Sequence, residues 1–337
     1  MKHVTIKEIA QQLNLSVSTV SRALADDKNI RRETKEKILA LADMLGYKPN
    51  PVALNLKYGR TNTIGVIVPE MVTPFASSVI EGIQQVLYPQ GAKVIIAQSN
   101  EDWEREKDNL LLMERFRVDG IIMALCHQDA NVEECVRIRN GGTPIVFYDR
   151  VPSKLDVTKV VIDDYSKSFL LTEHLIRSGR KRILYLQGPS YIHNTNDRLL
   201  GFKDALDKFH IDHDPSLIVR TRVSIHDGRE AIEEILSKGI AFDAVYAFTD
   251  TLAIGAMNVL TEKGFRIPEQ IAVAGFSGTI LSTIVNPHLT TVEQPLIRMG
   301  QTAAELLLEK IKDPSIPPKT VVLDAEIKLR ASTEGLA

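Results

Sequence analysis

Apolar residues recur three or four positions apart in residues 6–13, 17–25 and 34–45. This spacing is that of one face of a helix. Thr5 followed three residues later by Glu8 forms a capping-box pattern, which predicts that the first helix begins there. The segments between the three blocks are short. The pattern therefore predicts three short helices on the helix-turn-helix plan.

The second of these helices has one apolar face and one polar face. Ser18 and Arg22 lie on the polar face, and Val17 lies at its boundary. A serine bonds several bases, an arginine pairs with guanine through its two-pronged guanidinium, and a valine contacts the thymine methyl group. Ser16, a good helix cap, and Thr19 are candidates for phosphate contacts. The pattern favours a DNA-reading helix, and a three-helix module that binds another protein is the alternative.

From residue 61 onward, short β-rich runs alternate with amphipathic helical stretches. This alternation predicts parallel sheets covered by helices on both faces. The segment is long for one such sheet, so we expect two subdomains. No glycine-rich phosphate loop follows the first run. The β-rich runs are Thr63–Pro69, Ala92–Ser99, Asp119–Leu125, Pro144–Asp149, Arg182–Gly188, Asp243–Phe248, Ile271–Phe276 and Thr320–Ile327.

Charge is distributed unevenly along a chain of ordinary composition. The 337 residues are 44% hydrophobic and 25% charged, as expected of a folded protein. Residues 1–60 hold 11 Lys and Arg against 6 Asp and Glu, whereas the remainder holds 30 against 37. A basic head on an acidic body is typical of a nucleic-acid-binding segment attached to a domain that DNA repels.

Several classes of site and location are not supported by the sequence. Cys126 and Cys135 lack metal-binding spacing and are expected to be reduced. The histidines are scattered, so we expect no catalytic residue, no metal site and no cofactor. No apolar window is long enough to span a membrane, and the start lacks a signal-peptide pattern. A cytoplasmic location without membrane contact is therefore expected.

Several segments resemble one family of bacterial regulators. VTIKEIAQQLNLSVSTVSRAL and LADMLGYKPN resemble the N-terminal signature of the lac repressor (LacI/GalR) family. HLIRSGRKRILYLQGP, NDRLLGF and NPHLTTVEQP resemble segments of its effector domain. The resemblance implies a multi-domain protein, with an all-α helix-turn-helix head and an α/β, periplasmic-binding-protein-like body of two parallel-sheet subdomains.

The resemblance also implies domain boundaries. We expect a DNA-binding domain at 1–48, a hinge helix and linker at 49–60, and an effector-binding and dimerisation domain at 61–337. Within that last domain, the N-subdomain is expected at about 61–160 and 292–320, and the C-subdomain at about 161–291 and 321–337.

Family resemblance assigns DNA contacts to the head and to the hinge. Val17, Ser18 and Arg22 match the positions that read the operator. Leu56, in the hinge PNPVALNLKYGR, matches a leucine that wedges into the minor groove. From its sequence alone Leu56 is an ordinary linker leucine. The predicted DNA-binding residues are Thr5, Ser16, Val17, Ser18, Thr19, Arg22, Asn29, Asn50, Ala53 and Leu56.

An effector site is implied in the cleft between the subdomains. Arg198 is implied to hold ligand oxygens in two-pronged fashion, although without the resemblance it is a helix surface arginine. Many sugar-binding members have Asp where this chain has Ser277, and the missing negative charge makes a sugar acid or phosphate the hypothesis and a neutral sugar the alternative. The predicted effector-binding residues are Phe75, Asp149, Asn194, Arg198, Thr249, Asp250 and Ser277.

Together these features predict a ligand-controlled transcriptional repressor. It is expected to bind pseudo-palindromic, double-stranded operator DNA as a homodimer. The expected dimer interface uses the helix after Phe75 and the stretches Thr251–Lys263 and Ile280–His288. A solute-binding protein or receptor without a DNA role is the alternative, and an enzyme is disfavoured.

Overall fold

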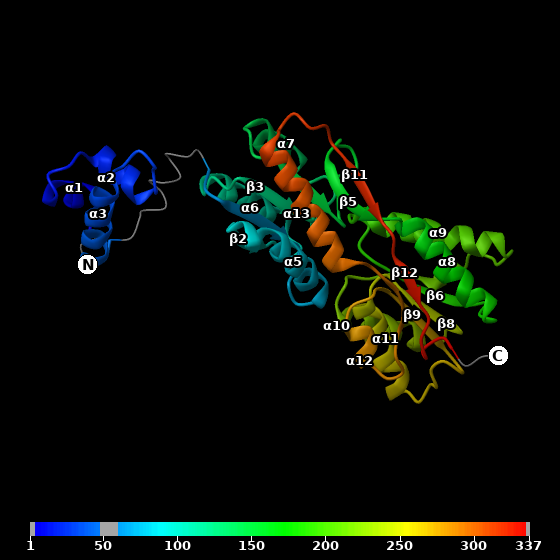
Figure 1. Cartoon of the computed structure of the whole chain (residues 1–337). Coiled ribbons are helices and arrows are strands. Elements are labelled where there is room, and N and C mark those ends of the chain that lie inside the picture. The colour runs from blue at the N-terminus through cyan, green and yellow to red at the C-terminus, as the bar shows by residue number, and fades with distance from the viewer. Residues whose placement is uncertain (1–3, 48–59, 335–337) are drawn as a thin grey trace. The chain divides into compact units, whose positions relative to one another are not determined.

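The computed structural model describes residues 4–47 and 60–334 and divides into two compact units, residues 1–61 and 62–337 (Figure 1). In the first unit, Thr5 caps the first helix in the capping box expected from the sequence. Its core consists of Ile9, Ala10, Val20, Ala23, Ile38 and Ala42. The three helices are α1 (Ile6–Gln12), α2 (Val17–Leu24) and α3 (Arg32–Met44).

The second unit contains two six-stranded sheets, one in each subdomain. In the N-subdomain sheet all neighbouring strands are parallel. Its order is β11 (Thr320–Leu323), β5 (Thr158–Ile162), β4 (Ile145–Tyr148), β3 (Gly120–Met123), β1 (Thr63–Val68) and β2 (Lys93–Gln98).

The C-subdomain sheet repeats this plan with one reversed edge strand. Only the pair of β10 and β12 is antiparallel among its described strands. Its order is β12 (Glu326–Lys328), β10 (Thr290–Glu293), β9 (Ala272–Ser277), β8 (Ala244–Ala247), β6 (Ile183–Gln187) and β7 (Ile218–Arg220).

The described part of the chain also contains the short helix α12 (Leu281–Ile284) and the 3-10 turns Tyr88–Gln90 and Pro215–Leu217. Longer helices cover both faces of each sheet. On the N-subdomain, α5 (Pro74–Leu87) and α13 (Leu296–Lys312) pack on one face, and α6 (Trp103–Arg115) and α7 (Val132–Asn140) on the other. On the C-subdomain these positions are taken by α8 (Asp164–Arg177) with α9 (His193–Lys208), and by α10 (Ile225–Ser237) with α11 (Asp250–Glu262).

Two glycines allow α5 and α13 to pack closely side by side (Figure 1). A Cβ atom on Gly82 would lie 2.0 Å from the carbonyl oxygen of Ile297. A Cβ atom on Gly300 would lie equally close, 2.0 Å, to the carbonyl oxygen of Val79. Real Cβ atoms cannot approach backbone this closely, so both positions require glycine. The helix pair is thereby fixed against the sheet that carries one wall of the cleft.

The chain crosses between the subdomains three times. The crossings lie between β5 and α8, between β10 and α13, and between β11 and β12. The run Thr320–Ile327 thus supplies one strand to each sheet, which Figure 1 shows as two successive strands near the C-terminus. The third crossing falls after Leu323, a few residues later than the boundary expected near residue 320. The predicted fold class is confirmed.

In the described ranges, no helix is both long and apolar enough to cross a membrane.

Candidate functional site

Helix α2 of the first unit presents a polar surface to solvent. Val20 and Ala23 turn into the core, whereas Val17, Ser18 and Arg22 are exposed. Arg22 has no ion pair with any described carboxylate, so its guanidinium is available to an external acceptor. An exposed helix face with one free guanidinium and one hydroxyl matches what base edges in a major groove require.

Four other predicted DNA contacts, Thr5, Ser16, Thr19 and Asn29, already have structural partners within the unit. The Ser16 hydroxyl accepts a hydrogen bond from the Thr19 N–H at 3.1 Å and lies 2.8 Å from the Ser18 hydroxyl. The Thr5 hydroxyl accepts from the Glu8 N–H at 3.3 Å, and the Asn29 amide donates to Asp27 at 2.9 Å. These hydroxyl and amide groups position the helices and the loop. A phosphate that contacts them would have to share them with these intramolecular hydrogen bonds.

The remaining predicted DNA contacts, Asn50, Ala53 and Leu56, lie outside the described residues.

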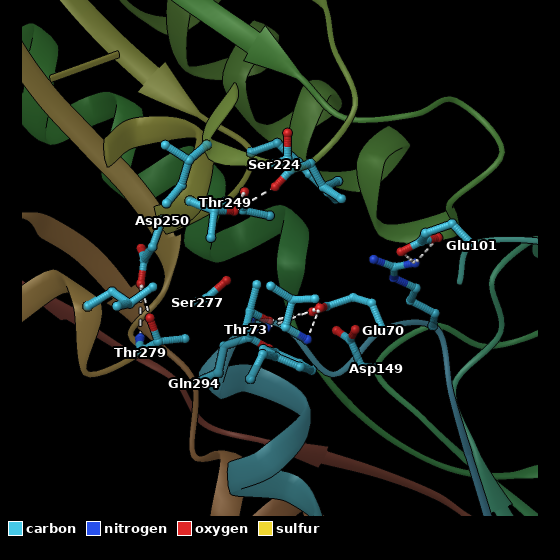
Figure 2. A pocket seen from close by; sticks show the side chains of 18 of the residues that line it. Glu70, Thr73, Glu101, Asp149, Ser224, Thr249, Asp250, Ser277, Thr279 and Gln294 are labelled. Carbon is cyan, nitrogen blue, oxygen red and sulfur yellow. Dashed lines mark hydrogen bonds and ion pairs between the residues drawn. The ribbon is translucent and has the colours of Figure 1, made fainter. Parts of the chain in front are cut away.

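In the second unit, the structure brings all seven predicted effector residues together. They line one cavity of about 510 Å³ between the subdomains. The side chains come from the carboxyl end of β9 and from the loops and helices that follow β1, β4, β6 and β8. Open parallel sheets bind ligands at these ends. Figure 2 shows Asp149, Glu70 and Gln294 on the side of the cavity opposite Thr249 and Ser224.

Arg198 is an almost fully enclosed charged group of this cavity, with a side chain only 3% exposed. Its Nε donates to Asp164 Oδ1 at 2.7 Å, and its Nη1 donates to the Phe248 carbonyl oxygen at 2.7 Å. The guanidinium carbon lies 3.6 Å from the centre of the Phe276 ring. The Nη2 group makes no hydrogen bond to a described residue and is left for a ligand.

Asp164 is the residue that orients Arg198. It is the first residue of α8, directly after the first crossing, and its side chain is 8% exposed. Burial raises the pKa of Asp164 to about 7, and the positive charge of Arg198 offsets part of that rise. The ion pair therefore depends on a carboxyl that titrates near neutral pH.

Asp250 and Thr249 serve mainly as scaffold. Asp250 accepts from the Thr291 hydroxyl at 2.6 Å and from the Thr279 N–H at 2.9 Å, which fixes the loop after β9. Burial raises the pKa of Asp250, and the bond from Thr291 opposes that rise. Thr249 caps α11 by accepting from the Leu252 N–H at 3.3 Å. Neither side chain is free to act as a ligand clamp.

Asp149 and Asn194 meet across the cleft. The Asn194 amide nitrogen donates to Asp149 Oδ1 at 3.2 Å, which leaves the buried Asn194 Oδ1 without a partner among the described residues. Burial raises the pKa of Asp149, and the nearby charge of Arg150 lowers it in part. Asp149 and Ser277 also have positive φ angles of 53° and 141°, a strained geometry that persists where surrounding structure enforces it.

A second contact beside the cavity also joins the subdomains. The Gln128 N–H donates to the Tyr191 carbonyl oxygen at 3.0 Å. The His127 ring stacks on the Tyr191 ring, with centroids 5.3 Å apart and planes within 8°. The cleft in this structure is therefore bridged at two places by groups from opposite subdomains.

The sequence reasoning missed further polar residues of the cavity. Arg150 Nη1 donates to both carboxylate oxygens of Glu101 at 2.8 Å, so these two charges neutralise each other. Glu70 accepts from the Val72 N–H at 2.7 Å and also bonds Thr73. The signal for these residues was their place directly after predicted strands, the same signal that found Asp149. In the described part of the chain, no group of His, Cys, Asp and Glu is placed to hold a metal ion.

Comparison with known proteins matches both units. Residues 5–50 match the family described as bacterial regulatory proteins, lacI family. Residues 61–329 match the family described as periplasmic binding proteins and sugar binding domain of LacI family. The second match alone covers most of the chain. The chain belongs to the lacI family.

Individual relatives of this lacI-family chain span nearly its whole length. The HTH-type transcriptional repressor PurR of Vibrio atlanticus (strain LGP32) is 32% identical over 332 residues, 98% of this chain and 99% of the relative. The lac repressor dimer bound to operator and the anti-inducer ONPF has a TM-score of 0.85 at 26% identity and covers 98% of this chain and 99% of its own. The CelR–cellobiose complex has a TM-score of 0.73 at 27% identity and covers 98% and 100%.

Membership of the lacI family settles the class of function. The chain is a DNA-binding transcriptional regulator with a small-molecule-binding body, and its relatives are regulators rather than enzymes. The alternative of a receptor without a DNA role is not favoured.

The burial of Asp164 beside Arg198 predicts a specific pH dependence of stability. Folding raises the pKa of Asp164 from about 3.9 in an unfolded chain to about 7. Between these values the folded state holds a proton that the unfolded state lacks, so stability falls as pH rises. The Asp164→Asn variant should lose this component, a slope of up to about 1.4 kcal/mol per pH unit.

Urea unfolding at pH 5, 6 and 7 measures the effect, followed by the fluorescence of Trp103, the single tryptophan. Asp163→Asn is the matched control, because Asp163 is exposed and asparagine preserves its cap of α8. Parallel stability curves for the wild type and Asp164→Asn would contradict the assignment.

Proposed function

We propose that this chain is a repressor whose affinity for operator DNA is set by a neutral, polyhydroxylated small molecule bound in the body. A neutral effector is supported by one observation: both arginine guanidinium groups of the cavity are already paired with carboxylates. Arg198 is held by Asp164, and Arg150 by Glu101. A repressor of this kind acts in the cytosol, where its operator lies.

Charge in the cavity disfavours the sugar acid or phosphate of our sequence-based hypothesis. Glu70, Glu101, Asp149 and Asp250 line the cavity, against Arg150 and Arg198. An anion entering the cavity would meet two arginines whose charges are already partly neutralised by carboxylates, and it would be repelled by Asp149. The CelR relative was solved with cellobiose, a neutral sugar.

Hydrogen-bonding capacity supports the same choice. Asp149 retains a free carboxylate oxygen, and Asn194 Oδ1 is a buried acceptor without a partner in the described residues. Both require donors, which sugar hydroxyls supply. Arg198 Nη2 supplies a donor to a hydroxyl or ring oxygen. Phe75 and Phe248 add apolar surface for the face of a sugar ring.

On the DNA side, we assign base reading to Val17, Ser18 and Arg22 on α2 and phosphate contacts to the residues around it. Two heads related by a twofold axis would read a pseudo-palindromic operator. We retain Asn50, Ala53 and Leu56 as proposed hinge contacts, with Leu56 as the minor-groove wedge. The operator-bound lac repressor, a dimer, supports this assignment by its similarity along the whole chain.

We propose a homodimer because the body exposes apolar side chains on both subdomains. Val72 is 90% exposed and Ile284 is 68% exposed, with Met71 and Ile280 beside them in sequence. Exposed apolar side chains that gather into a patch mark interaction surfaces. The expected contribution of Thr251–Lys263 is limited, because α11 is almost wholly buried within its own subdomain.

The first prediction from this proposed function concerns base reading. Arg22→Ala should cost about 1–3 kcal/mol on the preferred operator and little on random DNA, because it removes a two-pronged base contact. Fluorescence anisotropy with an operator selected from random DNA measures both affinities at two salt concentrations. Arg32→Ala is the control, since Arg32 is exposed on α3 and pairs with Glu36. Equal losses of Arg22→Ala on both DNAs would exclude base reading.

The second prediction concerns the effector. In a calorimetric panel of sugars with their phosphates and acids, a neutral sugar should bind more tightly than its anionic derivatives. Asp149→Asn should weaken that binding by about tenfold or more, because a charged acceptor of sugar hydroxyls is lost. Asp129→Asn, outside the cavity, is the control. Tighter binding of a sugar phosphate than of its parent sugar would refute the proposal.

The third prediction concerns assembly. Ile284→Asp should raise the dimer dissociation constant at least about tenfold, because it places a charge in an apolar interface. Sedimentation velocity over a range of concentrations measures this constant. Leu200→Asp, an exposed leucine on α9, is the control. A change of equal size in both variants, or in neither, would argue against this interface.

A further inference from the structure

A second cavity of about 560 Å³ lies in the N-subdomain and shares no lining residue with the effector cleft. Ile145 and Thr158, the first residues of β4 and β5, lie in its wall. It is therefore at the amino ends of the strands, the edge of the sheet opposite the cleft. Figure 1 shows α7 and the end of α13 at this end of the subdomain. Its volume is in the range of small-molecule sites.

The floor and the outer wall of this cavity differ in chemistry. Ile145, Phe147 and Val157 form an apolar floor and are themselves almost fully buried. The outer wall is the segment 314–318, which contains three prolines. Prolines fix much of the backbone of this segment. A ligand would thus meet a preformed apolar surface and not a loop that has to be ordered first.

Two cationic side chains line the cavity without carboxylate partners. Arg139 Nη1 donates to the Asp156 carbonyl oxygen at 3.1 Å, and Lys310 Nζ donates to the Ile316 carbonyl oxygen at 2.6 Å. Neither forms an ion pair with any carboxylate of residues 4–47 and 60–334. By contrast Arg137, on the same helix as Arg139, pairs with Glu114 at 2.7 Å.

The two cations also repel each other. Burial lowers the pKa of Lys310, and the charge of Arg139 lowers it further, while the exposed Asp156 opposes both effects. Asp156 is the one carboxylate among the described lining residues. The charged groups that face the cavity are therefore two cations and one anion, and a bound anion would relieve the repulsion between the cations.

We propose that this cavity is a second ligand site, for a small organic anion with an apolar body. Its carboxylate or similar group lies between Arg139 and Lys310, and its apolar body lies on Ile145, Phe147 and Val157. The apolar floor distinguishes this ligand from a bare phosphate ion, and the cation pair distinguishes it from a neutral sugar.

Such a ligand would contact two elements that also reach the effector cleft. Strand β4 begins at Ile145 in the second cavity and is followed by Asp149 in the cleft. Helix α13 begins two residues after Gln294 of the cleft and carries Lys310 near its other end. The second site is thus placed to influence the first through shared rigid elements.

Nuclear magnetic resonance of the methyl groups of the full chain tests the proposal, with benzoate as the probe. Benzoate should shift the methyl signals of Ile145 and Val157. Benzamide, which has the same shape without the charge, and inorganic phosphate, which has no apolar body, should each bind at least about tenfold more weakly. Lys310→Met and Arg139→Met should each weaken benzoate binding by about tenfold or more.

Lys312→Met is the matched control, because Lys312 is exposed on the same helix and lies outside the cavity. Circular dichroism checks the fold, and if one variant fails to fold, the other carries the test. The proposal is overturned if benzoate shifts no methyl signal of this cavity, if it shifts only Leu281 of the cleft, if benzamide or phosphate binds equally well, or if a folded Lys310→Met or Arg139→Met variant binds benzoate as the wild type does.

Discussion

A buried guanidinium organises the effector cavity of this protein. Arg198 cannot lie almost fully enclosed without a counter-charge, because an unpaired buried charge is very unfavourable. Asp164 supplies that charge, Phe248 supplies a carbonyl acceptor, and Phe276 supplies a ring face. These partners come from the first residue of α8 and from the ends of β8 and β9. The part of the effector cavity around Arg198 therefore forms only when several distant segments of the C-subdomain are in place.

Other residues of the effector cavity connect this C-subdomain part to the N-subdomain. Asn194 reaches Asp149 from the C-subdomain, and Tyr191 contacts Gln128 and His127 nearby. A ligand between Asp149 and Arg198 would add to contacts that close the cleft. A ligand shifts the equilibrium between open and closed subdomains only if it binds one of these states more tightly than the other. A ligand that contacts these bridging groups can therefore favour the closed state.

Motif residues were predictable from the sequence, and their partners were not. Val17, Ser18 and Arg22 stand in a contiguous signature, and Arg198 stands in NDRLLGF. The pairing of Glu101 with Arg150 joins residues 49 positions apart, and no local pattern shows it. For the same reason, the sequence does not show whether the Thr249 hydroxyl caps α11 or binds a ligand. The tertiary structure shows that it caps the helix.

Short strands limited the prediction of the fold. The runs that became β5 and β10 are only five and four residues long and lack a clear periodic signal. The run Thr320–Ile327 reads as one strand, yet Asp324 and Ala325 carry the chain between sheets. Strand propensity is the same in either sheet, so only the tertiary crossing decides where such a run divides.

The central claim is that operator binding and effector binding are coupled. A reciprocal titration tests this coupling most directly. The dissociation constant of a selected operator is measured with and without a saturating neutral sugar, and that of the sugar with and without operator. The account predicts one common factor, of about 5 to 150, in both titrations. An operator affinity that saturating sugar leaves unchanged would contradict it.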